Sequence, residues 1–451
     1  MNKIFIPILA LVILASCAKD PEPGAKTNET ALDIQLKSVL STASNNNLNS
    51  FKLPASDDYI SIPQDPKNPI TKAKVDLGQL LFHETKLASA PKNAAGEFTF
   101  ACSSCHHSQA GFQAGRFQGI ADGGMGFGIA GEARVKDPRI DGDSLDVQPI
   151  RTPSTMNTAY QQVMLWNGQF GATGVNVGTE ASWTVGTPKE TNKLGFEGIE
   201  TQAIAGLTVH RMKIDKKFCD DNNYTQMFNR AFPRTPIDKN FTTRNAGLAI
   251  AAYERTLLAN EAPFQKWLDG EFTALTENQK EGAKLFFDVN KANCVSCHNG
   301  PALNSMTFHA LGVKNLDGPD VFGPNGTEAG ERLGRAGFTG KAEDEFKFKT
   351  PQLYNLIDNP FLGHGSSFST VKDFVVYMNN GVKENSGVPD NKLSVEFKPL
   401  GLTTTEINQI VDFIENGLYD PSLSRYTPLA VNSGNCFPVA DSVSRIDLNC
   451  N

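Results

Sequence analysis

Two copies of the string C-x-x-C-H carry the most specific chemistry in the sequence. One copy lies at 102–106 and the other at 294–298. The chain has 8 cysteines and 7 histidines among 451 residues, and random placement at these frequencies predicts only about 0.002 such strings. The pairs therefore have a chemical function. Their residues are Cys102, Cys105 and His106, and Cys294, Cys297 and His298.

This pattern is typical of covalent haem attachment, in which both thiols add to the haem vinyl groups and the histidine supplies an axial nitrogen to iron. The alternative is one zinc site shared by both cysteine pairs. Structural zinc usually gathers its pairs within roughly 15–20 residues, whereas these lie in opposite halves of the chain. Zinc also leaves the attached histidines unexplained. We expect two haem c groups, with His106 and His298 as ligands and His107 as a bystander.

The N-terminus resembles a bacterial secretory leader. Lys3 precedes an apolar run, Ile4–Leu14, and Cys17 follows two small residues, as at a lipoprotein cleavage site. The run is too short to span a bilayer. We therefore expect a signal peptide at 1–17, a flexible tether at 18–50 and a periplasmic protein held to an inner or outer membrane only by a lipid on Cys17.

Cysteine usage agrees with an oxidising compartment. Cys436 and Cys450 flank a polar stretch within a C-terminal tail at 425–451, and we expect them to form a disulfide. Cys219 is left over, and a buried, unreactive thiol is expected there. The formal charge of −7 and the 39% hydrophobic content describe an ordinary globular body, with no basic patch for nucleic acid. The acidity weakly favours a basic redox partner.

Helical periodicity dominates between the haem strings. Apolar residues recur at helical spacing in Arg244–Leu258, Glu277–Phe287 and Thr404–Ile414, with threonine caps at Thr276 and at Thr403 or Thr404. Alternating strand patterns are scarce. The sequence predicts a mainly α fold of two cytochrome c-like haem domains with long loops. We place the N-terminal domain at 51–262 and the C-terminal domain at 263–424.

Several strings give the chain a family resemblance. They include Leu77–Phe82 before the first haem motif, "YERTLL" at 253–258, "CHNGPALN" after the second motif and "LTTTEINQIVDFI" near the end. From about Ile70 to Asp420 the chain resembles the bacterial di-haem cytochrome c peroxidases, whose relatives include the enzyme that matures methylamine dehydrogenase. The resemblance implies a six-coordinate C-terminal haem that receives electrons and an N-terminal haem that cleaves hydrogen peroxide. It also implies a small cytochrome c or cupredoxin as electron donor, and it is compatible with a homodimer.

Met378 is the expected sixth ligand of the C-terminal haem. Val371, Phe374, Val375 and Met378 fall on one helix face, a pattern that by itself favours a core position over a ligand. The resemblance implies a methionine at this place, and a thioether raises the haem potential. The maturation enzyme has a tyrosine there, and Tyr377 is the neighbour in this chain.

The resemblance also implies a tryptophan between the haems that couples them electronically. Trp166 in "MLWNGQFG" matches, with Asn167 and Gln169 in place of an acidic and a basic residue. Without the resemblance, Trp166 could be a half-buried core indole. A calcium ion between the domains stays open, because Arg151 stands where the family has an asparagine, although Asp358 and Asn359 offer oxygens.

The peroxide-cleaving side departs from the family pattern. Cleavage needs a group that moves a proton between the two peroxide oxygens. Gln202 and Met212 align with the family, but His210 or Arg211 stands where a glutamate is expected, and Glu200 is a nearby carboxylate. A histidine of near-neutral pKa can do this proton transfer, and arginine can stabilise the departing hydroxide. His210 could instead ligate iron or cap a helix.

The segment after the first haem motif lacks the blocking histidine of many family members. No histidine occurs from Ser108 to Val209, and the glycine-rich loop, residues 119–131, offers only Met125 as a ligand. We expect a resting N-terminal iron that is already accessible to peroxide. A peroxidase is the first hypothesis; an oxidase acting on a protein or organic substrate and a plain di-haem electron carrier are the alternatives.

Overall fold

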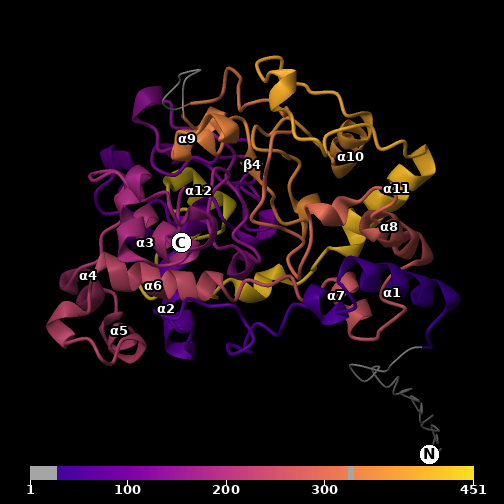
Figure 1. The fold of residues 1–451 in the computed structure, drawn as a ribbon. Helices are drawn as coiled ribbons and strands as arrows, with labels where there is room; N and C mark the ends of the chain where they lie inside the picture. Colours follow the sequence, from indigo (N-terminus) through magenta and orange to yellow (C-terminus); the bar gives the residue numbers. More distant parts are fainter. Residues whose placement is uncertain (1–27, 323–329, 451) are drawn as a thin grey trace, which may run out of the picture.

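The computed structural model describes residues 28–322 and 330–450. Within them the fold is mainly helical, and the named strands form two short two-stranded antiparallel sheets (Figure 1). The helices are α1 Ala31–Ala43, α2 Lys72–His83, α3 Gly198–Val209, α4 Lys216–Asp221, α5 Thr225–Ala231, α6 Thr243–Glu254, α7 Pro263–Leu268, α8 Glu277–Phe287, α9 Ala336–Thr339, α10 Val371–Asn380, α11 Thr404–Asp412 and α12 Ser442–Asp447. The strands are β1 Gly124–Met125, β2 Val135–Lys136, β3 Phe308–His309 and β4 Phe348–Lys349.

The three helices predicted from periodicity are present. Thr276 caps α8 and Thr403 caps α11, each in a capping box with the side chain three residues into the helix. Thr242 caps α6, which ends at Glu254 rather than continuing to Leu258. The chain turns there because the Thr256 hydroxyl donates to the Tyr253 carbonyl at 2.7 Å.

Each half contains a pair of helices that cross at a glycine. A Cβ on Gly78 of α2 would lie 2.0 Å from the Ala249 carbonyl oxygen of α6, and a Cβ on Gly282 of α8 would lie 1.9 Å from the Gln409 carbonyl oxygen of α11. No side chain fits at either crossing, so both pairs require glycine. The same close contact therefore recurs beside each haem motif.

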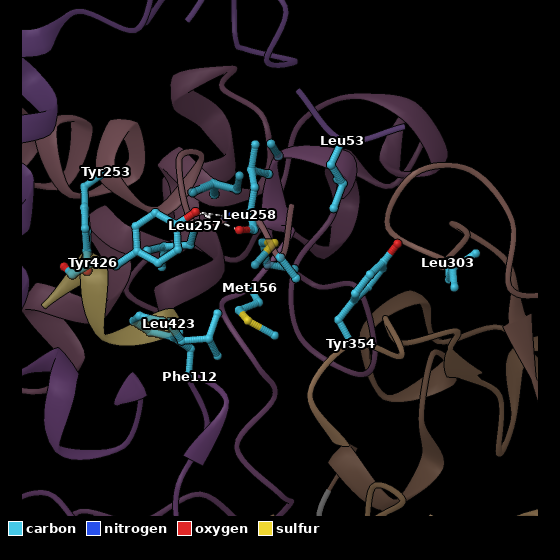
Figure 2. Close-up of a cluster of buried hydrophobic side chains, with 14 of the residues drawn as sticks. Leu53, Phe112, Met156, Tyr253, Leu257, Leu258, Leu303, Tyr354, Leu423 and Tyr426 are labelled. Carbon is cyan, nitrogen blue, oxygen red and sulfur yellow. Dashed lines mark hydrogen bonds between the residues drawn. The ribbon is translucent and has the colours of Figure 1, made fainter. Parts of the chain in front are cut away.

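A single buried cluster runs through both halves. It extends from Leu36 to Tyr426 and includes residues from every major helix. Figure 2 shows Met156 between Leu258 and Tyr354 in this cluster, and the Tyr426 hydroxyl donates to the Leu258 carbonyl at 2.7 Å. The two haem regions thus share one core across the boundary that we placed at residue 262.

The prediction of a flexible tether at residues 18–50 is wrong for residues 31–43, which are helical. Residues 31–43 form α1, which packs beside α8 (Figure 1). Leu36 and Leu40 are fully buried, and the Asp33 carboxylate pairs with the Lys280 ammonium at 2.7 Å. Leu32, Leu36 and Leu40 do recur at helical spacing, but the sequence reading grouped them with the polar residues on either side.

The C-terminal segment folds back onto the N-terminal half. Cys436 and Cys450 form the predicted disulfide, and Figure 1 shows α12 among segments of the N-terminal half. Cys219 is fully buried, as expected, and burial raises the pKa of its thiol to about 12. In the described ranges, no helix has the length and apolarity needed to cross a membrane. The proposed leader and Cys17 lie outside the described residues.

Candidate functional site: two haem motifs

The second haem motif opens into a cavity of about 540 Å³. Cys294, Cys297 and His298 line one part of it, and Met378 lines it from α10. Val371, Phe374 and Val375 lie on the same helix face and also line the cavity. The predicted thioether and the predicted proximal imidazole therefore face one space.

Both motif histidines are oriented by backbone carbonyls. The Nδ1 atom of His298 lies 3.0 Å from the Leu303 oxygen and 3.1 Å from the Pro351 oxygen, and Nδ1 of His106 lies 3.2 Å from the Phe112 oxygen. A carbonyl partner places the proton on Nδ1 and leaves Nε2 free to bind a metal. Burial lowers the pKa of each ring to about 4, which keeps it neutral as ligation requires.

The first motif is more enclosed. Burial raises the pKa of the Cys102 thiol to about 12 and that of Cys105 to about 11. His107 is buried, and neither ring nitrogen has a partner among the described residues. Its ring packs edge to face on Phe127, with centroids 4.9 Å apart. His107 is therefore held by ring packing, whereas His106 is oriented by a carbonyl.

These features fit haem c and do not fit zinc. The raised pKa of all four motif thiols keeps them neutral, whereas zinc needs thiolates gathered in one tetrahedron. No group of three or more His, Cys, Asp or Glu side chains in the described ranges could hold a metal ion. Haem would be held by both thiols and the histidine of each motif, with Met378 facing His298.

A repeated segment flanks both motifs. Residues 151–157 read RTPSTMN and 349–355 read KTPQLYN, each ending in an asparagine with positive φ, followed by a 3₁₀ turn. A β-bridge follows in both copies, Met164 with Phe170 and Leu362 with Phe368. When the two copies are aligned, Trp166 and His364 occupy equivalent positions. The fold thus contains two similar haem regions with different residues at equivalent places.

The side chains of Trp166 and His364 are in contact. Both line the C-terminal cavity, and their rings pack edge to face with centroids 6.3 Å apart. The His364 ring stacks on Phe348 at 3.6 Å, and its buried Nε2 has no partner within the described residues. The sequence analysis did not identify His364 as a site residue. The repeat at 151–157 and 349–355, which makes His364 equivalent to Trp166, could have indicated it.

His210 lies in a distal cluster that we define as His210, Arg211, Asp146 and Asp122. His210 ends α3, and its Nδ1 lies 2.8 Å from the Asp146 carboxylate. Arg211 Nη2 contacts the same carboxylate at 2.8 Å and Asp122 at 3.4 Å. Sequence reasoning paired neither aspartate with His210, because both belong to a loop far away in the chain.

Asp146 controls the protonation of His210. Burial alone would lower the pKa of His210, but the charge and hydrogen bond of Asp146 outweigh it and raise the pKa above its ordinary value. The Asp146 contact also orients the ring, so that Nε2 is the nitrogen available for proton transfer. His210 also lies close enough to His106 to influence its pKa. The predicted distal histidine and proximal ligand are therefore in one region.

Gln202 and Glu200 differ in their surroundings. Gln202 lies two helical turns before His210, on the same face of α3, with Gly206 between them. Glu200 is fully buried, and both of its oxygens pair with Arg255, at 2.9 and 2.7 Å. The structure does not place Glu200 in the distal cluster, and its carboxylate is already neutralised by a buried cation.

Comparisons with known proteins agree with this geometry. A family model described as di-haem cytochrome c peroxidase matches residues 72–273. The methylamine utilization protein MauG of Methylorubrum extorquens is 27% identical over 366 residues, covering 80% of this chain and 83% of that protein. Residues 72–273 belong to the di-haem cytochrome c peroxidase family. Members of this family are oxidoreductases.

One further relative and two solved structures are also similar to this chain. Cytochrome c peroxidase Ccp of Escherichia coli is 28% identical over 305 residues, covering 67% of the chain and 52% of that protein. A MauG-like protein associated with microbial copper homeostasis matches with a TM-score of 0.56 and 23% identity, covering 82% and 95% of the two chains. The diheme peroxidase BthA of Burkholderia thailandensis matches with a TM-score of 0.51 and 15% identity, covering 80% and 90%.

Arg151 stands at the asparagine position of the calcium site that the di-haem peroxidase resemblance left open. The Arg151 guanidinium is buried and donates to the Arg116 carbonyl at 2.9 Å, the Gln113 side chain at 3.0 Å and the Ala114 carbonyl at 3.2 Å. Asn359 uses its amide nitrogen on the same Ala114 oxygen, at 2.6 Å. The guanidinium therefore takes the Arg116, Gln113 and Ala114 oxygens, whereas the buried Oδ1 of Asn359 has no partner among the described residues.

Proposed function

We propose that the chain is a periplasmic di-haem peroxidase that reduces hydrogen peroxide to water with electrons from a small cytochrome c or cupredoxin. Electrons enter at the C-terminal haem and pass to the N-terminal haem. The observation that carries this proposal is the difference between two otherwise similar haem regions. Counted from the first residue of each helix, Met378 of α10 corresponds to Ala205 of α3, and alanine cannot ligate iron.

The C-terminal region supports a role in receiving electrons. Met378 shares a cavity with His298, and a soft thioether opposite imidazole favours the reduced iron. Tyr377 points elsewhere, because its buried hydroxyl donates to the Leu311 carbonyl at 2.6 Å. The tyrosine-ligated arrangement of the maturation enzyme therefore has less support than methionine ligation.

The N-terminal region supports peroxide cleavage. When bound, haem supplies the iron that binds peroxide and exchanges electrons. His210 accepts a proton from the near peroxide oxygen at Nε2 and returns it to the leaving oxygen, while Asp146 holds the ring through Nδ1. Arg211, fixed by the same carboxylate, stabilises the negative charge on the departing hydroxide. A plain electron carrier has no use for this arrangement.

Two measurements test the proposed function. Electron paramagnetic resonance of the resting protein is expected to show one high-spin or weakly ligated haem and one low-spin haem. Steady-state turnover with a reduced small cytochrome is expected to consume hydrogen peroxide without prior reduction. Two low-spin haems with no turnover would support the electron carrier. Oxidation of a protein or organic substrate in preference to the cytochrome would support the oxidase.

We also propose that the protein lies in the periplasm and is attached to a membrane by a lipid. Haem c attachment and the disulfide both agree with a periplasmic protein. Lipidation at Cys17 is proposed from the leader sequence alone. Mass spectrometry of the N-terminal peptide from the membrane fraction is expected to show an acylated Cys17, and Cys17→Ser is expected to release the protein from that fraction.

A further inference from the structure

The C-terminal segment contacts the glycine-rich loop through two carboxylates. The Asp447 side chain accepts hydrogen bonds from the backbone amides of Phe127 at 2.8 Å and Gly128 at 3.0 Å. The Asp441 side chain accepts one from the Gly126 amide at 3.1 Å. Three consecutive amides of one loop are thus bound by one short segment from the far end of the chain.

Arg134 connects the same carboxylate to the rest of the loop. Its buried guanidinium contacts Asp441 at 3.2 Å and donates to the Gly126 carbonyl at 3.3 Å and the Ala121 carbonyl at 2.7 Å. Burial would lower the pKa of Arg134, but the charge of Asp441 opposes this. Without Asp441, this arginine would be a buried cation with no charged partner in contact, so its position depends on the C-terminal segment.

The C-terminal segment is itself fixed to the first haem motif. Ser104, between the two motif cysteines, donates from its hydroxyl to the Pro438 carbonyl at 2.7 Å. The Ala440 amide donates to the Thr99 carbonyl at 2.9 Å. The disulfide between Cys436 and Cys450 closes the segment on itself. One covalently closed unit therefore contacts both the motif and the loop.

The loop in turn contacts the motif directly. Phe127, whose amide binds Asp447, packs its fully buried ring on His107, the neighbour of the proposed ligand His106. A Cβ added at Gly131 would lie 2.7 Å from His107 Nε2. Met125 is held in the β1–β2 hairpin through its pairing with Val135. The glycine-rich loop is thus held between the first haem motif and the C-terminal segment.

We propose that residues 435–450 form a clasp that fixes the glycine-rich loop against the first haem motif, with Asp441 and Asp447 as positioning residues. The clasp holds Met125 and its neighbours in one arrangement and keeps them from reaching the N-terminal iron. This proposal depends on the proposed haem site but not on the peroxide reaction. The loop therefore needs no reduction-driven movement before the site can react.

Hydrogen–deuterium exchange on the holoprotein tests the clasp. Asp447→Ala removes the acceptor of two amides from an exposed position, so the fold is retained. Amide exchange at residues 124–130 is expected to become at least about tenfold faster. A change of this size corresponds to the loss of roughly one charge-assisted hydrogen bond. Exchange in α8 and α11 is expected to stay unchanged. Asp220→Ala, which removes an exposed carboxylate of α4, is the matched control and is expected to change neither region.

A spectroscopic readout separates positioning from general stability. In Asp447→Ala, and more strongly in Cys436→Ser/Cys450→Ser, the resting spectrum of the N-terminal haem is expected to change while the C-terminal haem potential stays the same. Unchanged loop exchange in Asp447→Ala would overturn the clasp, as would faster exchange spread equally over α8 and α11. Because no turnover is measured, failure here leaves the proposed peroxidase activity to be judged by its own experiment.

Discussion

The rings of Trp166 and His364 lie edge to face at the cavity of the second haem motif, and the backbone of Arg151 bonds to both residues. The Trp166 indole donates to the Arg151 carbonyl at 2.8 Å, and the Arg151 amide donates to the His364 carbonyl at 2.9 Å. The ring centroids are 6.3 Å apart at an interplanar angle of 66°. The Arg151 backbone therefore fixes the Trp166 indole and the main chain of His364 next to each other.

This pair is expected to act as one unit in electron transfer between the haems. Trp166→Leu and His364→Leu should each slow oxidation of the C-terminal haem after peroxide addition, measured by stopped-flow absorbance. Because the rings are in contact, the double variant should be slower by less than the product of the two single effects. Fully multiplicative effects, at unchanged haem content, would show that the residues act separately.

Replacing Met378 is expected to alter one haem only. Met378→Leu removes the thioether that faces His298 across the cavity, so the potential of the C-terminal haem should fall in a spectroelectrochemical titration while the other potential stays put. Tyr377→Phe is the matched control, because the Tyr377 hydroxyl bonds to the Leu311 carbonyl. If both potentials are unchanged in Met378→Leu, Met378 is a core residue.

His210 is expected to govern both the rate of peroxide cleavage and its pH dependence. His210→Ala should slow cleavage by about 10²–10⁴. Only neutral His210 can accept the first proton, so activity should fall as the pH drops through its raised pKa. Asp146→Asn removes the main cause of that rise and should move the acidic limb to lower pH. An acidic limb that stays in place in Asp146→Asn would contradict the assignment.

Glu200 is expected to matter for stability. Glu200→Gln leaves the fully buried Arg255 with Glu197 as its remaining carboxylate partner, at 2.9 Å. We expect a loss of about 3 kcal/mol in the free energy of unfolding and a normal rate of peroxide cleavage per folded molecule. Denaturant unfolding measures the first and turnover the second, with Glu97→Gln at an exposed position as control. A stable but inactive Glu200→Gln protein would restore Glu200 as the proton donor.

Chelation is expected to have no effect on the purified protein. Arg151 supplies the positive charge among the Gln113, Ala114 and Arg116 oxygens, so EDTA should change neither the melting temperature nor the turnover, and elemental analysis should find no calcium. Arg151→Ala should lower the melting temperature, because it leaves those buried oxygens without their donor. Restoration of EDTA-treated wild type by added calcium would contradict this expectation.

The sequence predicted the local features and missed the long-range ones. The capped helices α8 and α11, the Met378 face and the disulfide depend on spacing within short segments, and the structure contains them. Asp146, by contrast, reaches His210 from a loop that has no periodicity. Likewise, α1 is stabilised by the distant residue Lys280. Such partners are set by the tertiary fold, which single-sequence patterns do not describe.

The two ends of the described chain also imply an order of assembly. Helix α1, made early, packs beside α8 of the later half, whereas the clasp, made last, covers the first haem motif. In a secreted chain that emerges N-terminus first, the first motif is present long before its cover. The first haem can thus be attached to an open site and enclosed only when the last residues arrive. Two halves made separately and divided at residue 262 would each lack the segment that completes them.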